Sequence, residues 1–118
     1  MIEKTTENGT IKYTETALAQ IIGSKTCEIP GVSSLASKNY AEGLLKKLQK
    51  EQYANGITVE GNEDKINITI AIIVNTKMNF SEVAKNVIAG VKYDVERLTS
   101  LTVENITVLI QDVVVDEN

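Results

Sequence analysis

The stretch that decides the fold runs from Ile66 to Val74 and reads INITIAIIV. Isoleucine recurs at every second position from Ile66 to Ile72, and β-branched residues are enriched in strands. Because successive side chains of a strand point to opposite faces of a sheet, these isoleucines share one face. The alternation predicts a long strand over Ile66–Asn75 whose isoleucine face lies in the core.

A long amphipathic helix is predicted directly after this strand. Asn79, followed three residues later by Glu82, resembles a capping box at a helix start. From residue 80 to residue 98, apolar side chains recur at intervals of three and four, which is the spacing of one helix face. A last strand is predicted over Glu104–Val115, where the inward alternation is Ile106, Val108 and Ile110.

The N-terminal part predicts a disordered segment, a strand and a helix. Residues 1–8 are polar and are expected to be disordered. Gly9–Thr14 alternates as a short strand, and Thr14 is a suitable N-cap for the helix that follows. Pro30 and Gly31 end this helix, because proline disfavours a helical residue before it and glycine permits the exit.

The middle of the chain predicts three shorter elements. Val32–Ser37 is a short strand, and Lys38–Tyr53 has the apolar spacing of a helix. Ile57–Glu60 is a strand that a hairpin joins to the isoleucine strand. The order of elements predicts an α+β fold, a two-layer sandwich with a mainly antiparallel sheet and two to three helices on one face. We expect a single domain over residues 9–115 and an acidic tail over residues 116–118.

Composition excludes several classes of function. The chain has 118 residues, a net charge of -4, one cysteine and no histidine. Without histidine there is no Ser-His or Cys-His nucleophile pair, and the common zinc and iron ligand sets are missing. The acidic balance argues against a general nucleic-acid binder. With no apolar leader or membrane-length segment, the sequence predicts a cytoplasmic protein without cofactor or metal.

The only cysteine lies beside the only proline, in the stretch TCEIPGV over residues 26–32. Cys27 falls near the helix C-terminus, where the negative end of the helix dipole disfavours a thiolate. We therefore expect Cys27 to be non-catalytic and Pro30–Gly31 to be a structural turn. Gly31 is expected to need either a positive φ or a close backbone approach.

The predicted helices cover only one face of the sheet, so the composition of the other face must be considered separately. Alternation places an apolar patch on that open face, which marks a possible interface; its residues are Ala71, Ile73, Leu109 and Val113. Two sets of charged residues are weaker candidates. A lysine patch could bind a charged ligand or nucleic acid, using Lys46, Lys47, Lys50 and further along Lys85 and Lys92. A carboxylate-only mechanism would have to use Glu60 with Glu63 or Asp64, and these residues fit a solvated hairpin rim.

The chain resembles the alkaline shock protein family, small proteins of Gram-positive bacteria tied to envelope stress. The resemblance covers residues 9–115 and rests on the segments Gly9–Ile11, Glu28–Val32, Gly56–Val59, Ile66–Val74, Val95–Leu101 and Val103–Val108. Its most specific pieces are the Pro-Gly-Val turn at residues 30–32 and the Leu-Thr-Ser-Leu segment at residues 98–101. One departure is Ser100, where the family often has glycine. The resemblance implies no catalytic site and a cytoplasmic protein that reaches the membrane through a separate anchoring partner.

Two functional hypotheses remain at this point. The first is a non-enzymatic scaffold or interaction protein with a stress role, which associates with itself and with a protein partner. The second is a binding module for a charged ligand or nucleic acid through the lysine cluster.

Overall fold

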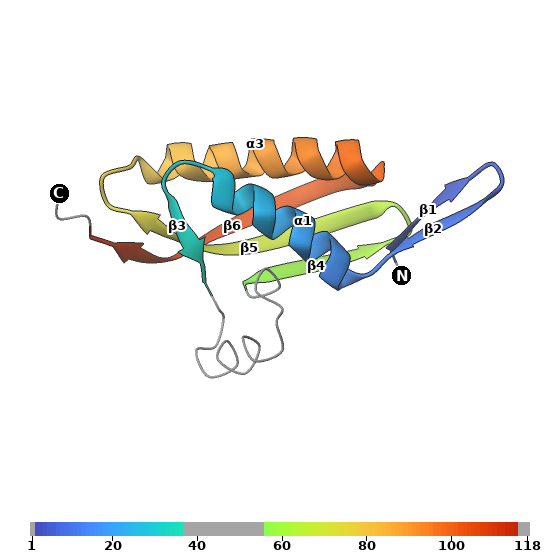
Figure 1. The fold of residues 1–118 in the computed structure, drawn as a ribbon, viewed down its shortest axis with the longest axis horizontal. Helices are drawn as coiled ribbons and strands as arrows, with labels where there is room; N and C mark the ends of the chain where they lie inside the picture. The colour runs from blue at the N-terminus through green and yellow to red at the C-terminus, as the bar shows by residue number, and fades with distance from the viewer. Residues whose placement is uncertain (1, 37–55, 116–118) are drawn as a thin grey trace.

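The computed structural model describes residues 2–36 and 56–115, which form two layers (Figure 1). The helices α1 and α3 lie on one face of a sheet, and an N-terminal hairpin projects from one end. In chain order the elements are β1 (Ile2–Thr6), β2 (Gly9–Tyr13), α1 (Glu15–Glu28), β3 (Val32–Leu35), β4 (Ile57–Asn62), β5 (Lys65–Asn75), α3 (Phe80–Thr99) and β6 (Thr102–Val114).

The sheet is built around β5, as the isoleucine alternation predicts. β4 pairs antiparallel with Lys65–Ile70, and β3 pairs antiparallel with Ile72–Val74. These two short strands therefore follow one another along the same edge of β5. β6 pairs with the other edge in parallel, because α3 carries the chain back before β6 begins. The predicted α+β fold with a mainly antiparallel sheet is confirmed, and the parallel β5–β6 pair is its exception.

The core lies between the helices and the isoleucine face of β5. Ile66, Ile68, Ile70 and Ile72 are each at most 1% exposed, and burial of such a side chain contributes about 1.5–3 kcal/mol. The helix layer meets them with four valines of α3 and two residues of α1, all fully or almost fully buried: Val83, Val87, Val91, Val95, Leu18 and Ile22.

Both helices start at the predicted caps. The Thr14 hydroxyl accepts a hydrogen bond from the Ala17 N–H at 3.0 Å, and the Asn79 side chain accepts one from the Glu82 N–H at 2.9 Å. Such a cap satisfies a backbone donor of the first turn, which has no partner within the helix. The third predicted helix, over Lys38–Tyr53, lies outside the described residues.

The expected disorder of residues 1–8 is wrong for Ile2–Thr6, which form β1. β1 pairs antiparallel with β2 from Ile2 opposite Tyr13 to Thr6 opposite Gly9. Ile2 is 4% exposed and belongs to the core cluster. Its burial and the pairing with β2 supply the stability that the polar composition of this segment does not suggest.

Candidate interaction surface

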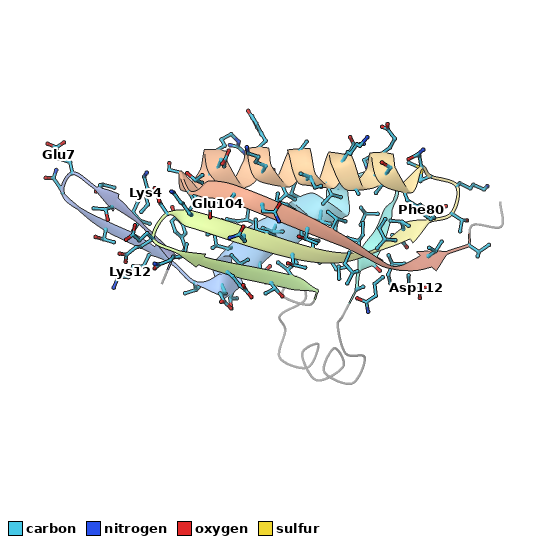
Figure 2. All side chains as sticks on the ribbon, turned by 180° about the vertical axis from the view of Figure 1, so that it is seen from behind. Lys4, Glu7, Lys12, Phe80, Glu104 and Asp112 are labelled. Atoms are coloured by element: carbon cyan, nitrogen blue, oxygen red, sulfur yellow. The ribbon has the colours of Figure 1, made fainter. Side chains whose placement is uncertain are left out.

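The face of the sheet opposite the helices is the candidate site, and we call it the open face (Figure 2). Its centre is polar and regular, because matching side chains of β4, β5 and β6 stand side by side. Thr69 lies between Thr58 and Thr107 in the strand register, and Asn67 lies between Glu60 and Asn105. Towards the C-terminal ends of β5 and β6, apolar side chains join the polar ones on this face.

Three of the four predicted patch residues lie on the open face. Ala71 and Leu109 are opposite each other in the β5–β6 ladder, and Ile73 is two residues further along β5. Leu109 is 47% exposed and Ile73 is half-buried, whereas Ala71 is 1% exposed. Leu109 and Ile73 therefore offer apolar surface, and Ala71 does not.

The placement of Val113 on the open face is wrong. Ile72 is opposite Ile110, but the next residue of β5, Ile73, is opposite Asp112. This register shift is a bulge, in which two residues of one strand oppose one residue of its partner. Beyond the bulge the alternation of β6 is reversed, so Asp112 faces outward and Val113 packs against the core.

The end of β6 carries apolar surface that the sequence reasoning missed. Val114 is 44% exposed and Val115 is 71% exposed. A signal was present, because a run of three valines over residues 113–115 cannot place every side chain inward in a strand. By this alternation Val114 shares the open face with Asp112, whereas Val115 follows the end of the strand. We call Leu109, Ile73 and Val114 the apolar end of the open face.

The Pro30–Gly31 turn lies in the helix layer, away from the open face. The Val32 N–H donates to the Ile29 carbonyl at 3.1 Å, and Gly31 has φ +96°. Proline at the second position and a positive φ at the third define a type II turn. A Cβ on Gly31 would lie 2.6 Å from Cγ2 of the buried Val83. The turn is therefore fixed by both backbone conformation and packing.

Cys27 lies in the last turn of α1 and is exposed. Partial burial raises the pKa of its thiol above the ordinary value. A raised pKa leaves little thiolate at neutral pH, and the thiolate is the reactive form. The surroundings of Cys27 thus disfavour nucleophilic chemistry.

The acidic residues of the β4–β5 turn hold neighbouring segments together. The Glu63 carbonyl accepts from the Glu3 N–H at 2.8 Å, and the Asp64 carbonyl accepts from the Thr102 N–H at 2.7 Å. The Asp64 carboxylate also lies 3.5 Å from Nζ of Lys4. These contacts join β1 and β6 to the turn. Two of them use backbone carbonyls, and of the two acidic side chains only that of Asp64 takes part, through Lys4. Glu60 lies apart from them on the open face.

The predicted lysine patch is only partly within the described residues. Lys46, Lys47 and Lys50 lie outside them, and Lys85 and Lys92 are exposed on α3. Over residues 2–36 and 56–115, no group of three or more histidine, cysteine or acidic side chains is arranged to hold a metal ion. In that same part of the chain, no helix combines the length and apolarity needed to span a membrane.

Over residues 2–36 and 56–115, these features define a small two-layer α+β domain in which both described helices lie on one face of the sheet. Two solved structures share this fold, both of them variants of the MamM CTD. Each aligns with a TM-score of 0.54 and 15% identity over 86% of this chain, and over 94% and 96% of its own chain. At this identity the likeness concerns the fold alone.

The chain belongs to the alkaline shock protein 23 family, described as having a cell envelope-related function, whose model matches residues 3–115. The resemblance seen in the sequence is thereby confirmed. The uncharacterized protein YloU of Bacillus subtilis is 34% identical over 113 residues, which cover 95% of this chain and 94% of that protein. The uncharacterized protein Spy1614 of Streptococcus pyogenes is 31% identical over 115 residues, or 96% and 95% of the two chains.

Proposed function

We propose that this protein is a non-enzymatic interaction module in cell envelope processes, a scaffold that associates with itself or a protein partner through the open face. The observation that carries the proposal is the apolar end of that face. Leu109 and Val114 are 47% and 44% exposed, and Ile73 is half-buried beside them. Single exposed apolar side chains are common, whereas several that gather at one place mark an interaction site.

The chemistry of the remaining side chains supports a binding role over catalysis. The chain has no histidine, and burial raises the pKa of its only thiol, at Cys27. Asp64 is engaged with Lys4, and its carbonyl with Thr102. A general acid or base works best with a pKa near the working pH, and this set of groups offers none arranged for that task.

The family membership supports a place for this module at the envelope. We propose a cytoplasmic protein with a stress role that attaches to the inner face of the membrane through a protein partner. Attachment through a partner needs a recognition surface and no membrane-spanning helix. Membranes from cells that lack the partner should then lose the protein, while its total amount stays unchanged.

A pair of matched variants tests the role of the open face. Leu109→Asp places a charge at its apolar end, whereas Tyr93→Asp places one on α3, where Tyr93 is 67% exposed. Crosslinking in native cells, followed by affinity capture, should recover partners or multimers with wild type and Tyr93→Asp and lose them with Leu109→Asp. Equal recovery with both variants would exclude the open face, and a wild-type protein that crosslinks to nothing would contradict the proposed function.

A further inference from the structure

We propose that a second copy of this chain binds along the free edge of β6, so that two β6 strands pair antiparallel and the sheet continues across the two chains. This inference rests on the proposed function and names its partner and contact surface. It depends on three features: the unpaired edge of β6, the residues along that edge, and the apolar side chains in both layers beside it.

Within residues 2–36 and 56–115, one edge of β6 is long and has no neighbouring strand. Among the described strands β6 pairs only with β5, although it runs for 13 residues. In a ladder, alternate residues direct their N–H and C=O groups away from the paired strand. A long unpaired edge is a template for another strand, and most proteins shorten, charge or cover it.

The middle of β6 lacks these protective features. Near each end of the strand, a backbone N–H group is already hydrogen-bonded to a carboxylate. From Asn105 to Ile110 the sequence reads NITVLI, without a charge, proline or glycine. At the start of the strand, the Val103 N–H donates to the Glu96 carboxylate of α3 at 2.9 Å. Near its end, the Val113 N–H donates to the Asp112 carboxylate at 2.8 Å. The accessible part of the edge thus lies between these two points, and β6 diverges from α3 along it (Figure 1).

Apolar side chains border this edge in both layers. In the sheet layer Leu109 is 47% exposed, and in the helix layer Ile88 is 36% exposed. α1 approaches α3 at Gly90, where a Cβ would lie 3.0 Å from the Lys25 side chain. At about 100° per residue, Ile88 is on the opposite flank of α3. Because α1 packs over β3 and β4 while α3 packs over β6, that flank lies towards the free edge.

A second copy fits this surface better than an isolated extended peptide. A peptide strand would bind the backbone of β6 and contact Leu109, but it would leave Ile88 exposed. A copy related by a two-fold axis brings its own helix layer beside Ile88 and its own Leu109 to the sheet layer. The axis makes the two strands antiparallel and keeps all helices on one side. The uncharged residues 105–110 occupy the centre of such a pair, and the acidic residues Glu104 and Asp112 lie at its ends.

Two threonines give a matched test. Thr107 on β6 and Thr58 on β4 flank the same residue, Thr69, on the open face. In a symmetric pair Thr107→Glu brings two carboxylates close together, and Thr58→Glu adds the same charge on the opposite side of β5. Sedimentation over a dilution series should show a rise of roughly tenfold or more in the dimer dissociation constant for Thr107→Glu and none for Thr58→Glu. Circular dichroism and thermal midpoints verify that both variants are folded.

The other outcomes separate this inference from the proposed function. If both glutamates weaken the dimer, the whole open face is the contact and the edge pairing is wrong. If neither glutamate weakens the dimer, the edge of β6 is excluded as the contact surface, although the protein still associates. A wild type that stays monomeric throughout the series refutes the edge pairing, and if it also captures no partner the proposed function fails as well. Hydrogen exchange adds a direct measurement: amides of residues 105–110 should be more protected in concentrated wild type than in Thr107→Glu, and equal exchange would refute strand pairing.

Discussion

Replacement of Gly31 by alanine should destabilise the protein through two separate costs. At the φ of +96°, a residue with a Cβ loses roughly 1–2 kcal/mol relative to glycine. The new Cβ would lie 2.6 Å from Cγ2 of Val83 and 3.0 Å from Cγ of Met78. Val83 is 1% exposed, and moving a packed core side chain costs about 1–3 kcal/mol. Alanine also lowers the conformational entropy of the unfolded chain, which offsets about 0.4–1 kcal/mol of this loss of stability. The net loss is about 2–4 kcal/mol.

Urea denaturation followed by circular dichroism measures this loss. With a slope of about 1–3 kcal/mol per M, the midpoint of Gly31→Ala should fall by roughly 0.7–4 M. Gly9→Ala is the matched control, because nothing lies within 4 Å of its added Cβ, and surface changes of this kind stay within about 0.5 kcal/mol. If Gly31→Ala denatures at the midpoint of Gly9→Ala, the turn is not held by packing or by its backbone conformation, and our account of it is refuted.

Three further predictions follow from burial and backbone conformation. Ile70→Asp should abolish the native circular dichroism spectrum, because Ile70 is 0% exposed and an unpaired buried carboxylate costs several kcal/mol; a native-like thermal midpoint would contradict the strand register. Ser100→Gly should stabilise by roughly 0.5–1 kcal/mol in urea, because Ser100 caps α3 with φ 62° and glycine adopts that conformation without strain. For Cys27, burial raises the folded-state pKa, so the folded protein holds the thiol proton more tightly than the unfolded chain. Urea midpoints of wild type should therefore fall relative to Cys27→Ser only as the pH rises above the ordinary thiol pKa, and a pH-independent difference would contradict this.

The elements that the sequence predicts well are those with a strong local pattern. The isoleucine alternation of β5 and the apolar spacing of α3 appear in the structure with almost the predicted bounds. The caps at Thr14 and Asn79 are equally local, because each depends on a donor three residues away. Ser100 also fits this class, since it occupies a left-handed helix end at which glycine is the usual residue.

The features that could not be predicted depend on residues far apart in the chain. β1 is polar in composition, and it is ordered by its pairing with β2 and by the contact of Glu3 with Glu63. The orientation of the Val113 side chain depends on a bulge in the pairing with β5. The sequence of β6 contains no residue that marks the position of this bulge. The apolar end of the open face was therefore found at Leu109 and Ile73, but Val114 was missed.

The neighbours of Ala71 have a consequence for how the length of this chain can change. The Ala36 N–H donates to the Ala71 carbonyl at 2.9 Å, and the Ala71 N–H donates to the Gly56 carbonyl at 2.8 Å. The residue after β3 and the residue before β4 are thus both hydrogen-bonded to the same residue of β5. Together β3 and β4 act as a single interrupted strand along this edge of β5. A change in the number of residues between Ala36 and Gly56 therefore need not change the register of the sheet.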